Sequence, residues 1–434
     1  MIQEQTPELV PYDPGTVMRA DSPLQGLNVR KAGSEMIDLS TEARAQRRAL
    51  GSRTCSLIVG LLTTLVLGMA SASAISPAEQ TASPPSIRSL AGREIRVRKS
   101  VTALTTAERK EFVDAVVALK HAKSPYDPSL SYYDQFVQWH KDRYVCHSGE
   151  HVPITKSMLM VHTGPMFLPW HREFIRRFED ALREVTGKAI TLPYWDWTDP
   201  ESVSRDNPRA VFREDFMGGD GNPDEQYAVT TGPFKKGVWT LNVRPEGATW
   251  VPSATTYLTR RLGVAQSLPT KAQIETVFAA GEYDVPPYSA ASDRGKSFRN
   301  ALEGNAGSNP MQCGSDGWMA FSSDLATTPA VVSDRPTFHN MVHGWVGGSL
   351  SSSGARPVIR GTMVLPTSPN DPIFFLHHAN VDRLWAAWQA AHPGKTYEPR
   401  AGYIGNNADS AMAPFGDVSP QRVEDINDLG YRYR

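Results

Sequence analysis

The sequence lacks the features that mark several large classes of protein. Its 434 residues hold only three cysteines, Cys55, Cys146 and Cys313, and these fit no zinc-binding spacing. Lysine plus arginine number 45 against 46 for aspartate plus glutamate, so a net charge of -1 provides no basic field for nucleic acid. The composition therefore indicates a small-molecule substrate and no nucleic-acid partner, and it leaves a Cys146–Cys313 disulfide open.

A hydrophobic run long enough to span a membrane is also missing. The most apolar stretch, residues 57–70, falls short of the roughly 20 residues that a bilayer requires. It follows a cluster of arginines that includes Arg47 and Arg48, and it precedes Ala72-Ser73-Ala74, which is the arrangement of a secretory signal peptide. We expect residues 1–74 to be an N-terminal extension and signal peptide, with Met36 as the true start, so that no membrane anchor remains after processing. The arginine pair leaves the twin-arginine export route open.

Downstream of the signal, composition and periodicity divide the chain. Residues 75–92, rich in Ser, Pro and Ala, predict a flexible lead-in, and a single catalytic domain is expected over 93–434. Thr105 and Glu108 have the spacing of a capping box at the start of an amphipathic helix. Residues 199–333 show no sustained periodicity, which predicts long loops and short strands.

The histidines of the chain have an unusual arrangement. Six histidines form two clusters, His140, His162 and His171 in the first and His339, His343 and His378 in the second. His339 and His343 are four residues apart, so one face of a helix can present both to one metal ion. Apolar periodicity around His140, after His171 and after His378 predicts three more helices. The expected fold is therefore mainly α, a four-helix bundle whose inward faces present all six imidazoles, with long loops and a few short strands around it.

The donor set indicates which metal this site would bind. A single histidine in an apolar helix is more often a core residue, but six converging histidines outweigh that interpretation. A zinc protease helix would need glutamate after the first histidine, where this chain has Asn340, and a di-iron bundle would need inward carboxylates. Ligation by nitrogen alone favours copper, one ion for each three histidines, with dioxygen shared between the two ions.

These segments resemble the two copper motifs of tyrosinases and polyphenol oxidases. The first motif is matched by residues 133–140, 162–174 and 192–197, the second by residues 339–348 and 368–385, and the resemblance extends from about Arg96 to Tyr433. It implies a type-3 dicopper oxidoreductase of the bacterial tyrosinase type. The first copper would be bound by His140, His162 and His171 and the second by His339, His343 and His378, with His377 as a non-ligand near the site.

The resemblance also implies roles for residues around the ligands. Arg98 would stack on the C-terminal Tyr431 and Tyr433, and Phe374 would pack against ligand imidazoles. Two carboxylates, Asp196 and Asp382, would accept hydrogen bonds from ligand imidazoles and so fix their tautomers.

The reaction depends on residues that hold a water or the phenol. In relatives that hydroxylate monophenols, an asparagine after the first histidine of the second site acts with a glutamate about eight positions before that histidine. Asn340 is present, but residues 330–333 contain no carboxylate. Asp334 lies closer to His339 than the expected glutamate would. We therefore predict oxidation of o-diphenols (catechols) or o-aminophenols with O2 to o-quinones or quinone imines. Gly344 would leave the site entrance open to bulky phenols, and Met160 replaces the cysteine that forms a thioether in fungal and plant relatives.

Three other interpretations stay open. One is a full tyrosinase, with monophenol monooxygenase activity and a product that feeds melanin or secondary metabolite biosynthesis. A haemocyanin-like oxygen carrier would need a β-rich shielding domain, which does not follow residue 434. A zinc-binding or structural module would use the histidines differently. A separate copper-delivery helper protein is compatible with the sequence, which does not identify the physiological phenol or the oligomeric state.

Overall fold

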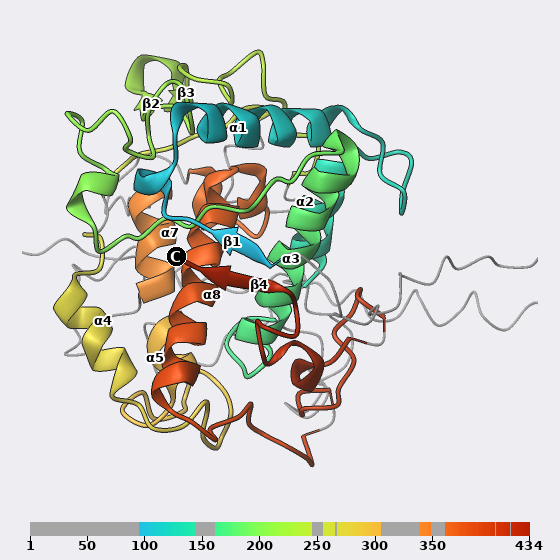
Figure 1. Cartoon of the computed structure of the whole chain (residues 1–434). Coiled ribbons are helices and arrows are strands. Elements are labelled where there is room, and N and C mark those ends of the chain that lie inside the picture. Colours follow the sequence, from blue (N-terminus) through green and yellow to red (C-terminus); the bar gives the residue numbers. More distant parts are fainter. Residues whose placement is uncertain are drawn as a thin grey trace, which may run out of the picture. The chain divides into compact units, whose positions relative to one another are not determined.

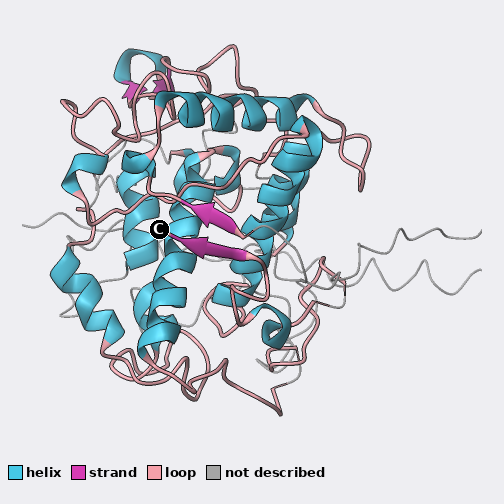
Figure 2. Ribbon diagram, in the orientation of Figure 1, coloured by secondary structure: helices cyan, strands magenta, loops and turns pink. Residues whose placement is uncertain are grey.

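Seven α-helices and two pairs of short strands form the part of the chain that the computed structural model describes (Figures 1 and 2). That part comprises residues 95–143, 161–244, 255–264, 267–304, 338–348, 361–403, 405–416 and 418–434. The predicted signal peptide, the lead-in, all three cysteines, Met160 and residues 330–334 lie outside it. None of the described helices is both long enough and apolar enough to cross a membrane.

Four of the helices correspond to the predicted bundle. They are α2 (Tyr132–Asp142), α3 (Phe167–Thr186), α7 (Phe338–Gly347) and α8 (Ile373–Ala391). Helix α3 begins at Phe167, one turn before the predicted start at His171. It ends at Thr186 and is capped by Gly187, whose φ of +66° is left-handed. The helix-rich fold that the sequence predicts is confirmed, but His162 lies in the loop before α3. The prediction that helices carry all six imidazoles is therefore wrong at His162.

Aromatic side chains join these helices into one core. Phe178 of α3 and Phe375 of α8 stack with their ring centroids 3.5 Å apart, and Phe136 of α2 meets Phe178 edge-on at 5.3 Å. Such pairs stabilise a core by about 0.5–1.5 kcal/mol beyond the area they bury. The stack fixes α3 against α8, the two helices that supply His171 and His378.

Helix α1 (Thr106–His121) covers this core, and it begins as predicted. The Thr105 hydroxyl accepts a hydrogen bond from the Glu108 amide at 3.2 Å, and the Glu108 carboxylate accepts one from the Thr105 amide at 2.9 Å. Phe112 and Val116 point inward from the same face. The predicted capping box and amphipathic helix are both confirmed.

The described part of residues 199–333, predicted as loops and short strands, also contains two short helices. Strands β2 (Gly221–Asn222) and β3 (Ala228–Val229) pair as expected, but α4 (Lys271–Phe278) and α5 (Phe298–Glu303) are helical. Thr270 and Gln273 form a capping box at the start of α4. That spacing was the available signal, and eight residues are too few to show a clear helical periodicity.

A buried network of charges closes the fold at its C-terminus. Strand β1 (Arg96–Arg98) pairs in parallel with β4 (Tyr431–Tyr433), next to α3 and α8 in Figure 1. The Arg98 guanidinium lies 3.7 Å from the centre of the Tyr431 ring and donates to the Tyr433 hydroxyl at 2.9 Å. The predicted stacking of Arg98 on both tyrosines is confirmed.

Asp382 of α8 is the shared acceptor of this network. It accepts from Arg98 at 3.3 Å, from the Tyr431 hydroxyl at 2.6 Å and from Arg172. Although burial opposes ionisation, the two arginines hold the pKa of Asp382 below its usual value. Because Arg172 follows His171 directly and Asp382 lies one turn after His378, the ion pair ties together two metal-site helices.

Substituting methionine for Arg98 should destabilise the protein strongly. The change leaves the buried carboxylates of Glu179 and Asp382 without one of their cations, and breaking a buried pair from one side costs about 3–5 kcal/mol. The exposed pair of Lys110 and Asp114 provides a control, because Lys110→Met should change stability by no more than about 1 kcal/mol. Denaturant unfolding measures both variants, and equal effects would contradict the importance of the network.

Candidate metal centre

The first histidine cluster brings a loop and two helices together. His140 comes from α2, His171 from α3 and His162 from the loop before α3, and one nitrogen from each lies within 4.8 Å of the others. The Nδ1 of His140 donates to the Pro366 carbonyl at 2.7 Å, and the Nδ1 of His171 donates to the Phe167 carbonyl at 2.8 Å. Since a carbonyl can only accept, both rings carry their proton on Nδ1 and present an unprotonated Nε2.

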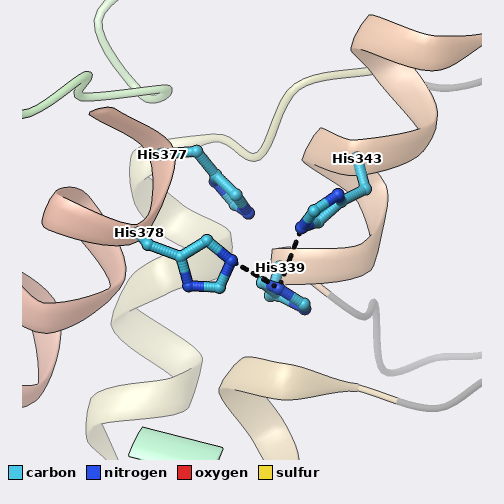
Figure 3. A group of neighbouring side chains, drawn as sticks. All are labelled: His339, His343, His377 and His378. Atoms are coloured by element: carbon cyan, nitrogen blue, oxygen red, sulfur yellow. Dashed lines mark hydrogen bonds between the residues drawn. The ribbon is translucent and has the colours of Figure 1, made fainter. Parts of the chain in front are cut away.

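The second cluster is built from α7 and α8 (Figure 3). The Nε2 atom of His339 lies 3.1 Å from that of His343 and 3.3 Å from that of His378. His343 donates from Nδ1 to the Met363 carbonyl at 2.6 Å, and His339 donates from Nδ1 to the Asn340 side-chain oxygen at 3.0 Å. His339 and His343 therefore direct unprotonated nitrogens at each other, which repel unless a proton or a cation lies between them.

A metal ion fits this arrangement better than a proton. Two imidazole nitrogens bound to one ion at about 2.0 Å, with a tetrahedral angle between them, lie about 3.3 Å apart. The Nε2 separations of 3.1 and 3.3 Å match that spacing. Of the adjacent histidines of α8, His378 has its Nε2 atom 3.3 Å from that of His339.

Burial keeps the histidines in the form that binds metal. Desolvation lowers the pKa of His171 to about 3 and that of His343 to about 4. It also lowers the pKa of His140, His162, His339 and His378. Because only neutral imidazole coordinates a metal, the fold presents the donors already deprotonated near neutral pH.

The two clusters lie side by side. The rings of His171 and His378, one from each cluster, stack with centroids 4.3 Å apart and an interplanar angle of 11°. Phe374 packs against both clusters, 4.9 Å from the His140 ring and 4.1 Å from the His378 ring. Its predicted packing against the imidazoles is confirmed, and two metal ions bound here would be neighbours.

The two carboxylates that were predicted as partners of the ligand imidazoles accept hydrogen bonds from other groups. Asp382 binds arginines and tyrosines, and Asp196 accepts from Thr198 and pairs with Arg383. Among the described residues, neither accepts from an imidazole, so the prediction that they fix ligand tautomers is wrong. Backbone carbonyls do this for His140, His171 and His343. Such acceptors carry no sequence signal, because every residue has one.

Glu303 is the site residue that sequence reasoning missed. It lies buried at the end of α5, and its carboxylate accepts from the backbone amide of Thr163, the residue after His162. The side-chain amide of Asn340, the residue after His339, donates to the carbonyl of Gly304. The end of α5 therefore contacts a residue next to each cluster. Counting back from His339 could not find Glu303, because residues 305–337 intervene.

The surroundings of Glu303 adjust its proton affinity. Burial raises the pKa of Glu303 to about 7, although Arg299, whose guanidinium lies 3.0 Å from the carboxylate, opposes the shift. Thr163 has a φ of +64°, which is unusual for a β-branched residue, and its bond to Glu303 helps to hold that conformation. A carboxyl group that titrates near neutral pH next to a metal centre can act as a proton acceptor.

Removing the metal should destabilise the fold, because the unprotonated nitrogens would then face one another. A metal present at about 100 times its dissociation constant adds about 2.7 kcal/mol to the free energy of unfolding. We expect calorimetry to show a lower melting temperature after chelation and recovery when copper is returned. Identical melting with and without metal would contradict a metal-binding interpretation of the two clusters.

Comparison with known proteins agrees with this geometry. The common central domain of tyrosinase matches residues 130–391, which include both clusters. A tyrosinase from Streptomyces glaucescens is 36% identical over 333 residues, covering 76% of this chain and 96% of that protein. The grixazone synthase of Streptomyces griseus is 32% identical over 313 residues, covering 69% of this chain and 86% of that protein.

A solved structure shows the same fold. The polyphenol oxidase of Thermothelomyces thermophila, solved as a point mutant, superposes with a TM-score of 0.52 at 23% identity. The match covers 78% of this chain and 89% of that one. Given the family domain, the sequence identity and the paired histidine clusters, the chain belongs to the tyrosinase family of type-3 copper oxidases, which use two copper ions.

Proposed function

We propose that the first copper is bound by His140, His162 and His171 and the second by His339, His343 and His378. The observation that supports this most directly is the convergence of the Nε2 atoms of His339, His343 and His378 at 3.1 and 3.3 Å. His171 and His378 stack at 4.3 Å, so ions in the two sites are close enough to act on one molecule of dioxygen. A copper pair supplies the redox chemistry that reduces O2 while phenols are oxidised.

The substrates that this site suits are o-diphenols and o-aminophenols. Two catechols and one O2 give two o-quinones and two waters, so four electrons and four protons leave the phenols. Asn340 and Gly344 are proposed to border the phenol, the first by positioning water or substrate and the second by leaving the entrance open. Gly344 itself lies buried in α7, one residue after His343.

Glu303 favours monophenol hydroxylation as a second activity. A monophenol must lose its proton before it is hydroxylated, and a buried carboxyl with a pKa of about 7 can accept that proton near neutral pH. The end of α5 contacts the residue after His162 and the residue after His339, which supports a place beside the substrate. This carboxylate removes the reason for restricting the enzyme to diphenols, so we infer the full tyrosinase reaction as well.

The N-terminal segment and the source of copper complete the proposal. We infer that residues 1–74 direct secretion and are removed, as the signal-like arrangement of residues 57–74 indicates. Because five of the six donors are buried and His343 is only partly exposed, copper has to enter a largely closed core, which favours delivery by a separate helper protein. Pigment formation is the role that quinone products suggest.

Replacing His343 with alanine should remove one of the two coppers together with the activity. His343 supplies one of three converging nitrogens of the second site, so the variant should bind close to one copper per chain instead of two. Atomic absorption measures the copper, and oxygen uptake with catechol measures turnover. His392, which stacks on Trp388 away from both clusters, gives a control variant, His392→Ala, that should keep both coppers. A fully active His343→Ala enzyme with two coppers would refute the ligand assignment.

Glu303→Gln should separate the two phenol reactions. Glutamine can still accept from the Thr163 amide but cannot take a proton, so the rate with tyrosine relative to catechol should fall about a hundredfold. In the unmodified enzyme, tyrosine hydroxylation should fall as the pH drops below about 7, because Glu303 becomes protonated. Oxygen uptake measured across pH tests both points. An unchanged ratio in the variant would show that Glu303 only supports the His162 loop.

A further inference from the structure

Four imidazoles, one more than a type-3 site uses, lie together at the second cluster. His377 precedes His378 on α8 and offers a nitrogen within 4.8 Å of those of His339, His343 and His378 (Figure 3). Its ring stacks on His339 with centroids 5.1 Å apart at 18° and meets His343 edge-on at 4.8 Å. Within the described chain the first cluster has three histidines, so the two clusters differ in donor number.

Packing alone does not account for His377. The side chain is fully buried, and neither ring nitrogen has a hydrogen-bond partner among the described residues. Leaving a buried polar group unpaired costs about 1–3 kcal/mol, whereas a phenylalanine would fill the same space without that cost. A neutral imidazole always keeps one unprotonated nitrogen, so His377 holds an unused lone pair beside three others.

We propose that His377 is an auxiliary copper donor of the second site. When this site binds copper alone, four imidazole nitrogens hold the ion, so the second site binds copper more tightly than the first and fills first. Nitrogens on opposite sides of one ion are about 4 Å apart at a bond length of about 2.0 Å. All four nitrogens lie within 4.8 Å of one another, so no separation has to close by more than about an ångström. A four-nitrogen set also suits the tetragonal geometry of oxidised copper.

The proposal rests on the ligand assignment given above and is tested by His377→Phe, which keeps the ring and removes both nitrogens. Copper-free full-length protein would receive one equivalent of Cu(II), and pulsed electron paramagnetic resonance would count the imidazoles coupled to the ion. We expect four in the unmodified protein and three in the variant. Competition with a chelator should show that the variant binds its first copper roughly tenfold or more weakly.

Two control variants distinguish the possible failures. His378→Phe should weaken binding of the first copper more than His377→Phe does, because it removes the nitrogen that lies 3.3 Å from that of His339. An effect no larger than that of His377→Phe would show that the ligand assignment itself is wrong. His392→Phe, outside both clusters, should leave the imidazole count and the affinity unchanged. Three coupled imidazoles and equal affinities in the unmodified protein and in His377→Phe would overturn the auxiliary role. If His377→Phe does not fold, His377→Asn allows the same comparison of imidazole count and copper affinity with the unmodified protein.

Discussion

The structure depends on holding unprotonated imidazole nitrogens close together in its interior. Such nitrogens repel one another, so the arrangement persists only where the surrounding fold is rigid and a cation relieves the repulsion. Backbone carbonyls fix the protons of His140, His171 and His343 on Nδ1, so that the Nε2 atom of each ring is unprotonated. Desolvation then keeps the rings neutral, because it penalises the charged form. The fold therefore determines the protonation states of these imidazoles independently of metal binding.

Rigidity comes from α3 and α8, which each supply one histidine to a different cluster. The stack of Phe178 on Phe375 and the ion pair of Arg172 with Asp382 join these two helices. Arg98 and Tyr431 connect the same carboxylate to the paired strands β1 and β4. The two ends of the described chain therefore stabilise the helix pair that sets how closely the two ions approach.

Local patterns in the sequence predicted the parts of the fold that local physics determines. The spacing of His339 and His343, the capping box at Thr105 and the apolar faces of the bundle helices all follow from helical periodicity, and the structure confirms them. Several features that depend on tertiary contacts were missed. Glu303 is separated from His339 by a long segment, Asp382 has partners at the other end of the chain, and His162 lies on a loop that a tertiary bond to Thr163 supports. No spacing rule could have found these contacts.

Anomalous diffraction from copper-loaded crystals, recorded at the copper absorption edge, tests the central claim most directly. The account predicts two copper ions roughly 3.5–4 Å apart, each bound through histidine nitrogens, one in each cluster. A single ion, or two ions too far apart to share one dioxygen molecule, would contradict it.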